Sequence, residues 1–463
     1  MMNKRKDPAV LPSSFRDPDG FLFLQNGILY RQINYSYKEN YDYLMSSNLY
    51  EKLLNKYLII PHKEIILKKT NRKTTAYKII QPDIVPFISY PYEWCFSELK
   101  DAALATLKIQ KTAIDNNMLL KDSSAFNIQF YNGLPIHIDS LSFEIYKEGS
   151  PWVAYSQFCR HFLAPLALMT YNDIRLNQLG KDYLDGILLD MASSLMPFIS
   201  KLNFGLLTHI HMHAAAQKKY SDKLKKISDV KTFSKTAMYA LIDNLESTIN
   251  NLKLKNKKTE WSDYKKNNNY SIDAIEDKKN IVSTYIKKIK PSVIWDLGAN
   301  DGLFSRITAC LGIKTIAFDI DPMCVEINYL KSKFEKDQNI LPLLIDITNP
   351  TPAIGWDNKE RLSLQERGPA DCVMALAFIH HLAIANNLPL DKIASFFSKI
   401  CSNLIIEFIP KNDSQVQTLL AGRFDIFPDY SQLNFEKIFK KYFIIIEKAS
   451  IKNSERTLYR MKV

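Results

Sequence analysis

Three aspartates in the last third of the sequence each end an apolar run. Asp296 follows VIW, Asp319 follows KTIAF, and Asp346 follows LPLLI. A turn that contains Gly298 and Gly302 comes directly after the first run. Carboxylates at strand ends accept hydrogen bonds from hydroxyl groups and attract cations. The spacing therefore predicts a site for a nucleotide-like ligand that carries positive charge.

The loop from Asp296 to Gly302 does not match the patterns that bind phosphate. The dinucleotide-binding fingerprint is GxGxxG, and the P-loop is GxxxxGK[ST]. Here Asn300 stands at the middle glycine position, and no Lys followed by Ser or Thr comes after Gly302. An acid at the start of the loop repels phosphate and suits a cationic group.

In these features the sequence resembles the class I S-adenosylmethionine-dependent methyltransferases, whose first motif is E/D-x-G-x-G-x-G. Four positions correspond to that motif: Asp296, Gly298, Asn300 and Gly302. The resemblance implies that this loop lies against the methionyl and ribose parts of the cofactor. It also implies that Asp319 accepts the ribose hydroxyls and that Asp346 contacts the adenine amino group. The alternative is that these acids only cap the helices that follow them.

Three further segments resemble a bacterial subgroup that includes host-specific nodulation-protein methyltransferases. They read MALAFIHHLAIANNLPL, IIEFIPKNDSQVQTLL and RFDIFPDYSQ. The resemblance implies an enzyme that transfers a methyl group from S-adenosyl-L-methionine to an acceptor. Related domains act on very different acceptors, so a small molecule, a glycan, a lipid-linked intermediate and a protein all stay open. A non-catalytic binding protein that retains the cofactor fold is an alternative.

The residues after the fourth apolar run would face the transferred methyl group, with Ala377 against the cofactor. They are Ala377, Phe378, Ile379, His380 and His381. Because a histidine pKa lies near neutrality, His380 and His381 are both candidates for the general base. The alternative is that one caps the next segment while the other packs. Glu407, near the end of the fifth strand, is a third catalytic candidate that would orient an acceptor hydroxyl or amine, unless it only pairs with Lys411.

A sheet must bring these residues together, and residues 291–463 show the alternation that such a sheet requires. The pattern predicts strands at 293–297, 314–319, 341–345, 371–377, 403–409, 441–448 and 456–462, with helices at 303–311, 322–335, 390–400, 413–421 and 433–440. The early strands are almost continuously apolar, which is typical of a parallel sheet with helices on both faces. The last two predict an antiparallel closing hairpin. We therefore expect a Rossmann-like α/β domain with its ligand at the carboxyl ends of the strands.

Residues 1–216 predict a separate α+β domain that recognises the acceptor or a partner. Asn26-Gly27 indicates a hairpin within residues 20–34, and Asn132-Gly133 indicates a second one between FNIQFY and LPIHIDSLSF. Helical spacing dominates from Trp152 onwards, with a kink expected at Pro165.

The second hairpin region also resembles the catalytic loop of kinases and aminoglycoside phosphotransferases. Asp122 and Asn127 have the D-x-x-x-x-N spacing, and Asp139 follows. In those enzymes the first Asp accepts the hydroxyl proton, while the Asn and the last Asp hold magnesium. No glycine-rich loop stands upstream, and only Arg31 could replace the phosphate-binding lysine. A degenerate kinase-like scaffold and a phosphotransferase-methyltransferase fusion are therefore both alternatives for this half.

Residues 217–290 predict a basic helical connector between the two domains. From Ala216 to Lys290 the sequence has 18 lysines and no arginine against 9 acidic residues, whereas the whole chain carries a net charge of +12. Basicity that is concentrated in a lysine-rich connector argues against a nucleic-acid partner. Trp261, Tyr264 and Tyr270 would cover the cofactor from outside, with ordinary packing as the alternative.

The remaining features predict a cytoplasmic protein without a bound metal. No apolar run reaches the roughly 18 residues that span a bilayer, and the six scattered cysteines form no CxxC pair. His209, His211 and His213 lie two residues apart in a helical context, so their side chains cannot converge on a metal. The long connection at 348–371 predicts a lid or an acceptor-binding loop, with disorder as the alternative. The sequence does not predict the oligomeric state.

Overall fold

The computed structural model describes residues 9–66, 75–220, 232–254, 271–421 and 424–463, and the chain forms two compact units. Unit 1 comprises Met1–Lys255 together with Ile354–Arg361, and unit 2 comprises Asn256–Ala353 together with Leu362–Val463. The short segment Ile354–Arg361 therefore belongs to unit 1, although its chain neighbours on both sides belong to unit 2.

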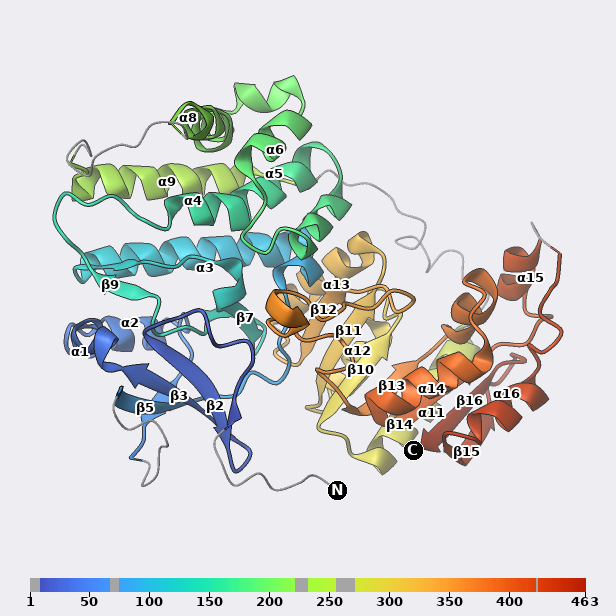
Figure 1. Ribbon diagram of the computed structural model, residues 1–463. Coiled ribbons are helices and arrows are strands. Elements are labelled where there is room, and N and C mark those ends of the chain that lie inside the picture. Colours follow the sequence, from blue (N-terminus) through green and yellow to red (C-terminus); the bar gives the residue numbers. More distant parts are fainter. Residues whose placement is uncertain (1–8, 67–74, 221–231, 255–270, 422–423) are drawn as a thin grey trace. The chain divides into compact units, whose positions relative to one another are not determined.

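Unit 2 is built on a seven-stranded sheet with the order β12-β11-β10-β13-β14-β16-β15 (Figure 1). The strands are β10 (Val293–Leu297), β11 (Lys314–Asp319), β12 (Ile340–Leu344), β13 (Ala370–Ala375), β14 (Cys401–Phe408), β15 (Ile444–Ser450) and β16 (Thr457–Lys462). The first five are parallel, whereas β16 pairs antiparallel with both β14 and β15. The predicted Rossmann-like α/β sheet with an antiparallel closing hairpin is confirmed. Its strand order reverses between β10 and β13, which is where such sheets bind ligands.

Helices cover both faces of this sheet. They are α11 (Ile272–Ile289), α12 (Leu303–Ala309), α13 (Pro322–Glu335), α14 (Leu390–Ile400), α15 (Ser414–Leu420) and α16 (Gln432–Phe439), with a π-helical turn, η10, at His381–Ala385. Leu458 of β16 packs in one apolar cluster with α11. The next residue, Tyr459, lies 5.1 Å from the Phe435 ring of α16, measured between ring centroids. Because successive strand residues point to opposite faces, α11 and α16 lie on opposite sides of the sheet.

Unit 1 begins with a five-stranded antiparallel sheet in the order β1-β2-β3-β5-β4. The strands are β1 (Ala9–Val10), β2 (Gly20–Gln25), β3 (Ile28–Asn34), β4 (His62–Glu64) and β5 (Ala76–Pro82), and the helices next to them in the chain are α1 (Lys38–Ser46), α2 (Leu49–Asn55) and α3 (Phe96–Asp115). The hairpin predicted at Asn26-Gly27 is confirmed by the β2–β3 pairing. Both turn residues have positive φ, 54° and 80°, which explains why Asn and Gly stand there.

Two small sheets follow α3 in unit 1. They consist of β6 (Met118–Leu120) paired with β9 (Phe143–Ile145), and of β7 (Ile128–Tyr131) paired with β8 (Leu134–His137). The hairpin predicted at Asn132-Gly133 is confirmed, but its second strand is shorter than expected. The chain turns at Asp139, whose Oδ1 accepts a hydrogen bond from Leu141 N, so LPIHIDSLSF contributes to two sheets rather than one.

The rest of unit 1 is helical. Its elements are α4 (Tyr155–Phe158), the π-helical η4 (Cys159–Leu163), α5 (Ala164–Tyr171), the 3₁₀-helical η5 (Ile174–Lys181), α6 (Leu189–Leu195), η6 (Phe198–Leu202), α7 (Phe204–Leu206), the π-helical η7 (Leu207–Met212), α8 (His213–Tyr220) and α9 (Lys235–Asn251). The widened turn η4 ends two residues before Pro165. A π-turn accommodates the helix irregularity that a proline introduces, because proline has no N–H to donate.

The segment Ile354–Arg361 is anchored by its own contacts within unit 1. Ile354 and Arg361 exchange two backbone hydrogen bonds of 3.1 Å each. The Arg361 guanidinium lies 4.2 Å from the centroid of the Phe126 ring, and Glu360 accepts a hydrogen bond from Arg16 Nε. These contacts fix the middle of the connection for which a lid or acceptor-binding role is predicted.

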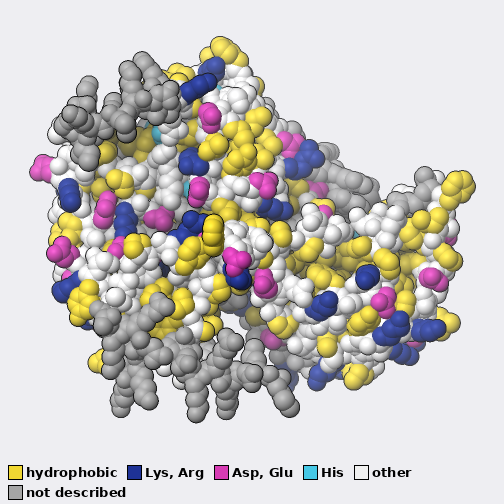
Figure 2. Space-filling view, in the orientation of Figure 1, with side chains coloured by type: hydrophobic (Ala, Val, Ile, Leu, Met, Phe, Trp, Pro, Cys, Tyr) yellow, Lys and Arg dark blue, Asp and Glu magenta, His cyan; other side chains and the backbone are white. Residues whose placement is uncertain are grey.

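Two surface properties bear on partners. In the part of the chain that the structure describes, no helix is both long and apolar enough to cross a membrane. On the face shown in Figure 2, basic side chains (dark blue) are scattered among acidic ones (magenta). Among the described side chains visible on that face, basic residues do not form a continuous surface.

Candidate cofactor-binding site

The loop after β10 has backbone conformations with positive φ, which few residue types adopt. Gly298, Asn300 and Gly302 all have positive φ, at 70°, 51° and 79°. A Cβ on Gly298 would lie 2.7 Å from the Phe378 ring, and one on Gly302 would lie 2.3 Å from Asn328 Oδ1. Asparagine tolerates the left-handed conformation better than other residues that carry a Cβ. The departure from the motif at Asn300 is therefore compatible with the loop, whereas the two glycines are sterically required.

Asp319, the last residue of β11, holds this loop in place. Its Oδ2 accepts a hydrogen bond of 2.7 Å from Asn300 N, and its Oδ1 accepts one of 2.9 Å from Asp321 N. Asp296 is also buried, and its Oδ2 accepts a hydrogen bond of 2.6 Å from Ser305 Oγ. Burial raises the pKa of each carboxyl to about 6, and the charge of Asp319 contributes to the shift at Asp296. Because burial disfavours the charged forms of both carboxyls, a bound cation would stabilise these acids in their ionised forms.

A cavity of about 380 Å³ opens at the carboxyl ends of the parallel strands of unit 2. Seven of the predicted site residues line it: Asp296, Gly298, Asn300, Asp319, Asp346, Ala377 and His381. Asp346 follows β12, and its Oδ1 accepts hydrogen bonds from Thr348 N at 2.8 Å and Thr348 Oγ1 at 2.6 Å. The sheet thus brings the ends of four strands, β10 to β13, to one cavity. The other three predicted residues, Gly302, His380 and Glu407, are not among the lining residues.

The chain turns sharply after β13. Ala377 has a φ of 48°, which is uncommon for a residue with a Cβ, and its N–H donates a 2.6 Å hydrogen bond to Glu407 Oε2. His380 and His381 follow with their ring centroids 4.1 Å apart. Burial lowers the pKa of His381 to about 4, with a further contribution from the charge of Arg456. Burial also lowers the pKa of His380 well below its ordinary value, so both imidazoles are neutral at neutral pH.

A buried ion pair underlies this turn. Lys278 Nζ lies 2.7 Å from Glu407 Oε2, and the two side chains are 4% and 0% exposed. Arg456 Nη1 lies 3.8 Å from Glu407 Oε1, and the Arg456 Nε donates a 2.7 Å hydrogen bond to Asp413 Oδ2. Burial lowers the pKa of Lys278, and the carboxylate of Glu407 opposes that shift. Glu407 is therefore fully engaged by cations and by a backbone amide.

Lys278 is a cavity-lining residue that the sequence motifs do not identify. A signal for it exists in helix α11, where Ala274, Lys278 and Val282 follow one another at intervals of four residues and are all buried. A lysine within the buried stripe of an amphipathic helix requires a partner. The sequence does not show that this partner is Glu407, more than a hundred residues away.

Two further predictions concern three aromatic residues before the sheet and a row of three histidines. Trp261, Tyr264 and Tyr270 lie outside the described residues. The rings of His209 and His211 hydrogen-bond to separate sets of side chains, which are Tyr155 and Asn244 for the first and Ser193 and Ser200 for the second. Within the described ranges, no group of three or more His, Cys, Asp or Glu residues is arranged to hold a metal ion.

Comparison with solved structures gives low similarity over less than half of the chain. The protein WbdD is 14% identical, with 43% of this chain and 42% of that chain covered and a TM-score of 0.30. The N-methyltransferase NodS from Bradyrhizobium japonicum WM9 is 10% identical over 41% of this chain and 96% of its own, with a TM-score of 0.31. Magnesium protoporphyrin IX methyltransferase from Synechocystis PCC 6803 is 15% identical over 45% of this chain and 87% of its own, with a TM-score of 0.29. At such values, the fold assignment rests on the strand order of unit 2.

Comparison of sequences is more decisive. No protein-family model matches the chain. Nodulation protein NoeA of Rhizobium meliloti (strain 1021) is 33% identical over 459 residues, which cover 98% of this chain and 96% of NoeA. The similarity thus extends through both units and the connection between them. The chain belongs to the same protein family as nodulation protein NoeA.

Proposed function

We propose that the protein is an S-adenosyl-L-methionine-dependent methyltransferase whose catalytic unit is unit 2. The observation that carries the proposal is the convergence of Asp296, Asp319 and Asp346 with the glycine loop in one cavity. These acids lie at or just after the ends of three successive strands, and the cavity lies where the strand order reverses.

The charges of the cavity favour a ligand with a positive centre. Asp296 and Asp319 are buried close enough to influence each other, and burial raises both pKa values. A sulfonium and an amino group would stabilise both carboxylates in their ionised forms. We assign Asp319 to the ribose hydroxyls and Asp346 to the adenine amino group. The loop Gly298–Gly302 is assigned to the methionyl and ribose parts.

The bound cofactor would supply a methyl group that an acceptor atom attacks in line with the bond to sulfur. We assign the acceptor side of the cavity to the turn after β13, where Ala377, Phe378 and His381 line the wall. His381 lines this wall as a neutral imidazole, and we assign it the acceptor proton, although the burial that lowers its pKa to about 4 makes it a weaker base than an exposed histidine. We assign Glu407 a positioning role, because it is paired with Lys278 and holds the Ala377 amide.

Calorimetric titration with S-adenosylhomocysteine tests the proposal. We expect micromolar binding by the wild-type chain and a loss of at least about tenfold in affinity for Asp319→Ala, because that carboxylate provides charge-assisted hydrogen bonds. Asp337→Ala is the matched control, since Asp337 lies on the same unit away from the cavity lining. A folded wild-type protein that does not bind the compound would refute the proposal. Transfer of labelled methyl groups into a lysate, fractionated by size and charge, then identifies the acceptor class.

A further inference from the structure

Two neighbouring loops of unit 1 bring together a second group of polar residues. One loop joins β6 to β7 and carries Asp122 and Asn127, and the other joins β8 to β9 and carries Asp139. Two backbone hydrogen bonds of 2.8 Å hold the loops together: Ile138 N to Asn127 O, and Lys121 N to Ser142 O. The D-x-x-x-x-N segment and the later aspartate therefore lie side by side in the folded unit.

Ser142 connects the two residues of this group that resemble metal ligands. Asn127 Nδ2 donates a 3.3 Å hydrogen bond to Ser142 Oγ, and the Ser142 side chain also hydrogen-bonds to Asp139. In kinases, the Asn of this pattern and the last Asp hold the magnesium ions that bridge the nucleotide phosphates. Unit 1 thus links, through Ser142, the two residue types that hold such a cation in kinases.

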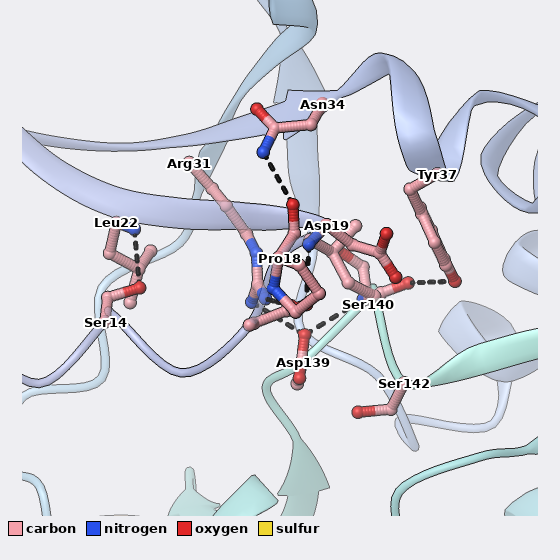
Figure 3. Close-up of polar contacts among 12 residues, drawn as sticks. Ser14, Pro18, Asp19, Leu22, Arg31, Asn34, Tyr37, Asp139, Ser140 and Ser142 are labelled. Carbon is pink, nitrogen blue, oxygen red and sulfur yellow. Dashed lines mark hydrogen bonds and ion pairs between the residues drawn. The ribbon is translucent and has the colours of Figure 1, made fainter. Parts of the chain in front are cut away.

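A guanidinium already stands at the aspartate of this pair. Arg31 extends from β3 towards Asp139, as Figure 3 shows, and its Nη1 lies 2.7 Å from Asp139 Oδ1. The Arg31 Nη2 also lies 3.3 Å from Asp17 Oδ2, so one buried guanidinium forms ion pairs with two carboxylates. Burial by itself would raise the pKa of Asp139, but the charge of Arg31, together with hydrogen bonds from the Leu141 amide and the Ser142 side chain, holds the pKa below its usual value. The carboxylate is therefore ionised and compensated without a metal.

We propose that Arg31 takes the place of the divalent cation in a phosphotransferase-type site of unit 1. A guanidinium at 2.7 Å occupies one side of the Asp139 carboxylate and cancels the charge that would attract magnesium. The neighbouring cation, Lys121, is paired in the same way, with its Nζ 2.5 Å from Asp19 Oδ2. Unit 1 in this form holds a permanent internal cation and does not bind magnesium-nucleotide. The inference concerns unit 1 alone and does not depend on methyl transfer in unit 2.

Replacement of the arginine by a neutral residue tests the proposal as a gain of metal binding. In Arg31→Met, Asp139 loses its partner while Asn127 and Ser142 stay beside it, which recreates a site for a divalent cation. We expect 1 mM Mn²⁺ to raise the melting temperature of Arg31→Met by about 3 °C, because a ligand that binds only the folded state stabilises it. We expect no shift for the wild-type chain. Differential scanning fluorimetry of the full chain measures both.

Two control variants show whether the new binding depends on the proposed ligands. Arg31→Met/Asp139→Asn removes the metal ligand, so the Mn²⁺ shift should disappear. Lys121→Met removes a cation from the same cluster, Lys121 being paired with Asp19, but leaves the Arg31 guanidinium on Asp139. No Mn²⁺ shift is expected for Lys121→Met.

The outcomes separate the proposal from its alternatives. A Mn²⁺ shift confined to Arg31→Met supports it. An equal shift in the wild-type chain, no shift in folded Arg31→Met, or phosphate transfer from magnesium-ATP by the wild-type chain would each overturn it. If Arg31→Met does not fold with or without Mn²⁺, Arg31→Gln, which retains a polar side chain, takes its place and is judged by the same criteria. Binding of S-adenosylhomocysteine, measured on the same samples, reports separately on unit 2.

Discussion

Removal of Lys278 should destabilise unit 2 much more than removal of a similar lysine on the same helix. In Lys278→Met, Glu407 keeps Arg456 as a cationic neighbour, at 3.8 Å, and its side chain is fully buried. Breaking a buried ion pair from one side costs about 3–5 kcal/mol, and the remaining arginine places the expected value near the lower end, at about 3 kcal/mol. This corresponds to a melting temperature lower by about 6–12 °C for a unit of this size.

Hydrogen exchange followed by mass spectrometry resolves this effect within the full chain. Amides of β13 and β14 that exchange only when the sheet unfolds should exchange about 150-fold faster in Lys278→Met than in the wild-type chain, because about 3 kcal/mol corresponds to that ratio. Lys288→Met is the matched control, because Lys288 lies on the same helix as Lys278 but is 48% exposed. Its Nζ pairs with Glu447 Oε2 at 2.8 Å. That change should cost less than about 0.5 kcal/mol.

A double variant distinguishes the charge from the packing of the lysine. In Lys278→Met/Glu407→Gln the buried negative charge is removed as well, so we expect recovery of more than half of the lost protection. The reasoning is refuted if Lys278→Met exchanges no faster than Lys288→Met. It is equally refuted if the double variant is less stable than Lys278→Met.

Four further expectations concern the cavity of unit 2. Asn300→Gly should retain stability and binding of S-adenosylhomocysteine, whereas Asn300→Val should lose about 1–2 kcal/mol in urea unfolding, because a β-branched residue does not adopt a φ of 51° without strain. The pKa values of Asp296 and Asp319 are raised to about 6, so the folded state binds more protons than the unfolded state between pH 4 and 6. The free energy of unfolding of the ligand-free protein should therefore fall as pH rises through that interval. Above pH 6 both acids are ionised, and the affinity for S-adenosylmethionine relative to S-adenosylhomocysteine should rise about fivefold from pH 5 to 7.5 in calorimetry; a constant ratio would contradict a role for these charges. His381→Ala should lower kcat by about 100-fold with little change in cofactor affinity, and an unchanged kcat would exclude His381 as the base.

Much of unit 2 could be predicted from the sequence because its signals are local. Apolar runs that end in acids define the parallel strands, and the positions of Asp319 and Asp346 at strand ends place both at one edge of the sheet. The Lys278–Glu407 pair could not be predicted, because it depends on how α11 packs across the sheet. The break at Asp139 depends in the same way on pairing between β6 and β9, which are separated along the chain by the β7–β8 hairpin.

The segment Ile354–Arg361 was also beyond local prediction, since nothing in its own residues indicates that it belongs to unit 1. Its placement has a consequence for synthesis of the protein on the ribosome. Domains generally fold in the order in which they emerge. Here the Phe126 ring and Arg16 emerge early, but their partners Arg361 and Glu360 emerge only after β10, β11 and β12 have been made. Unit 1 therefore stays incomplete until most of the chain has left the ribosome. It can be completed only after the first three strands of unit 2 have been synthesised.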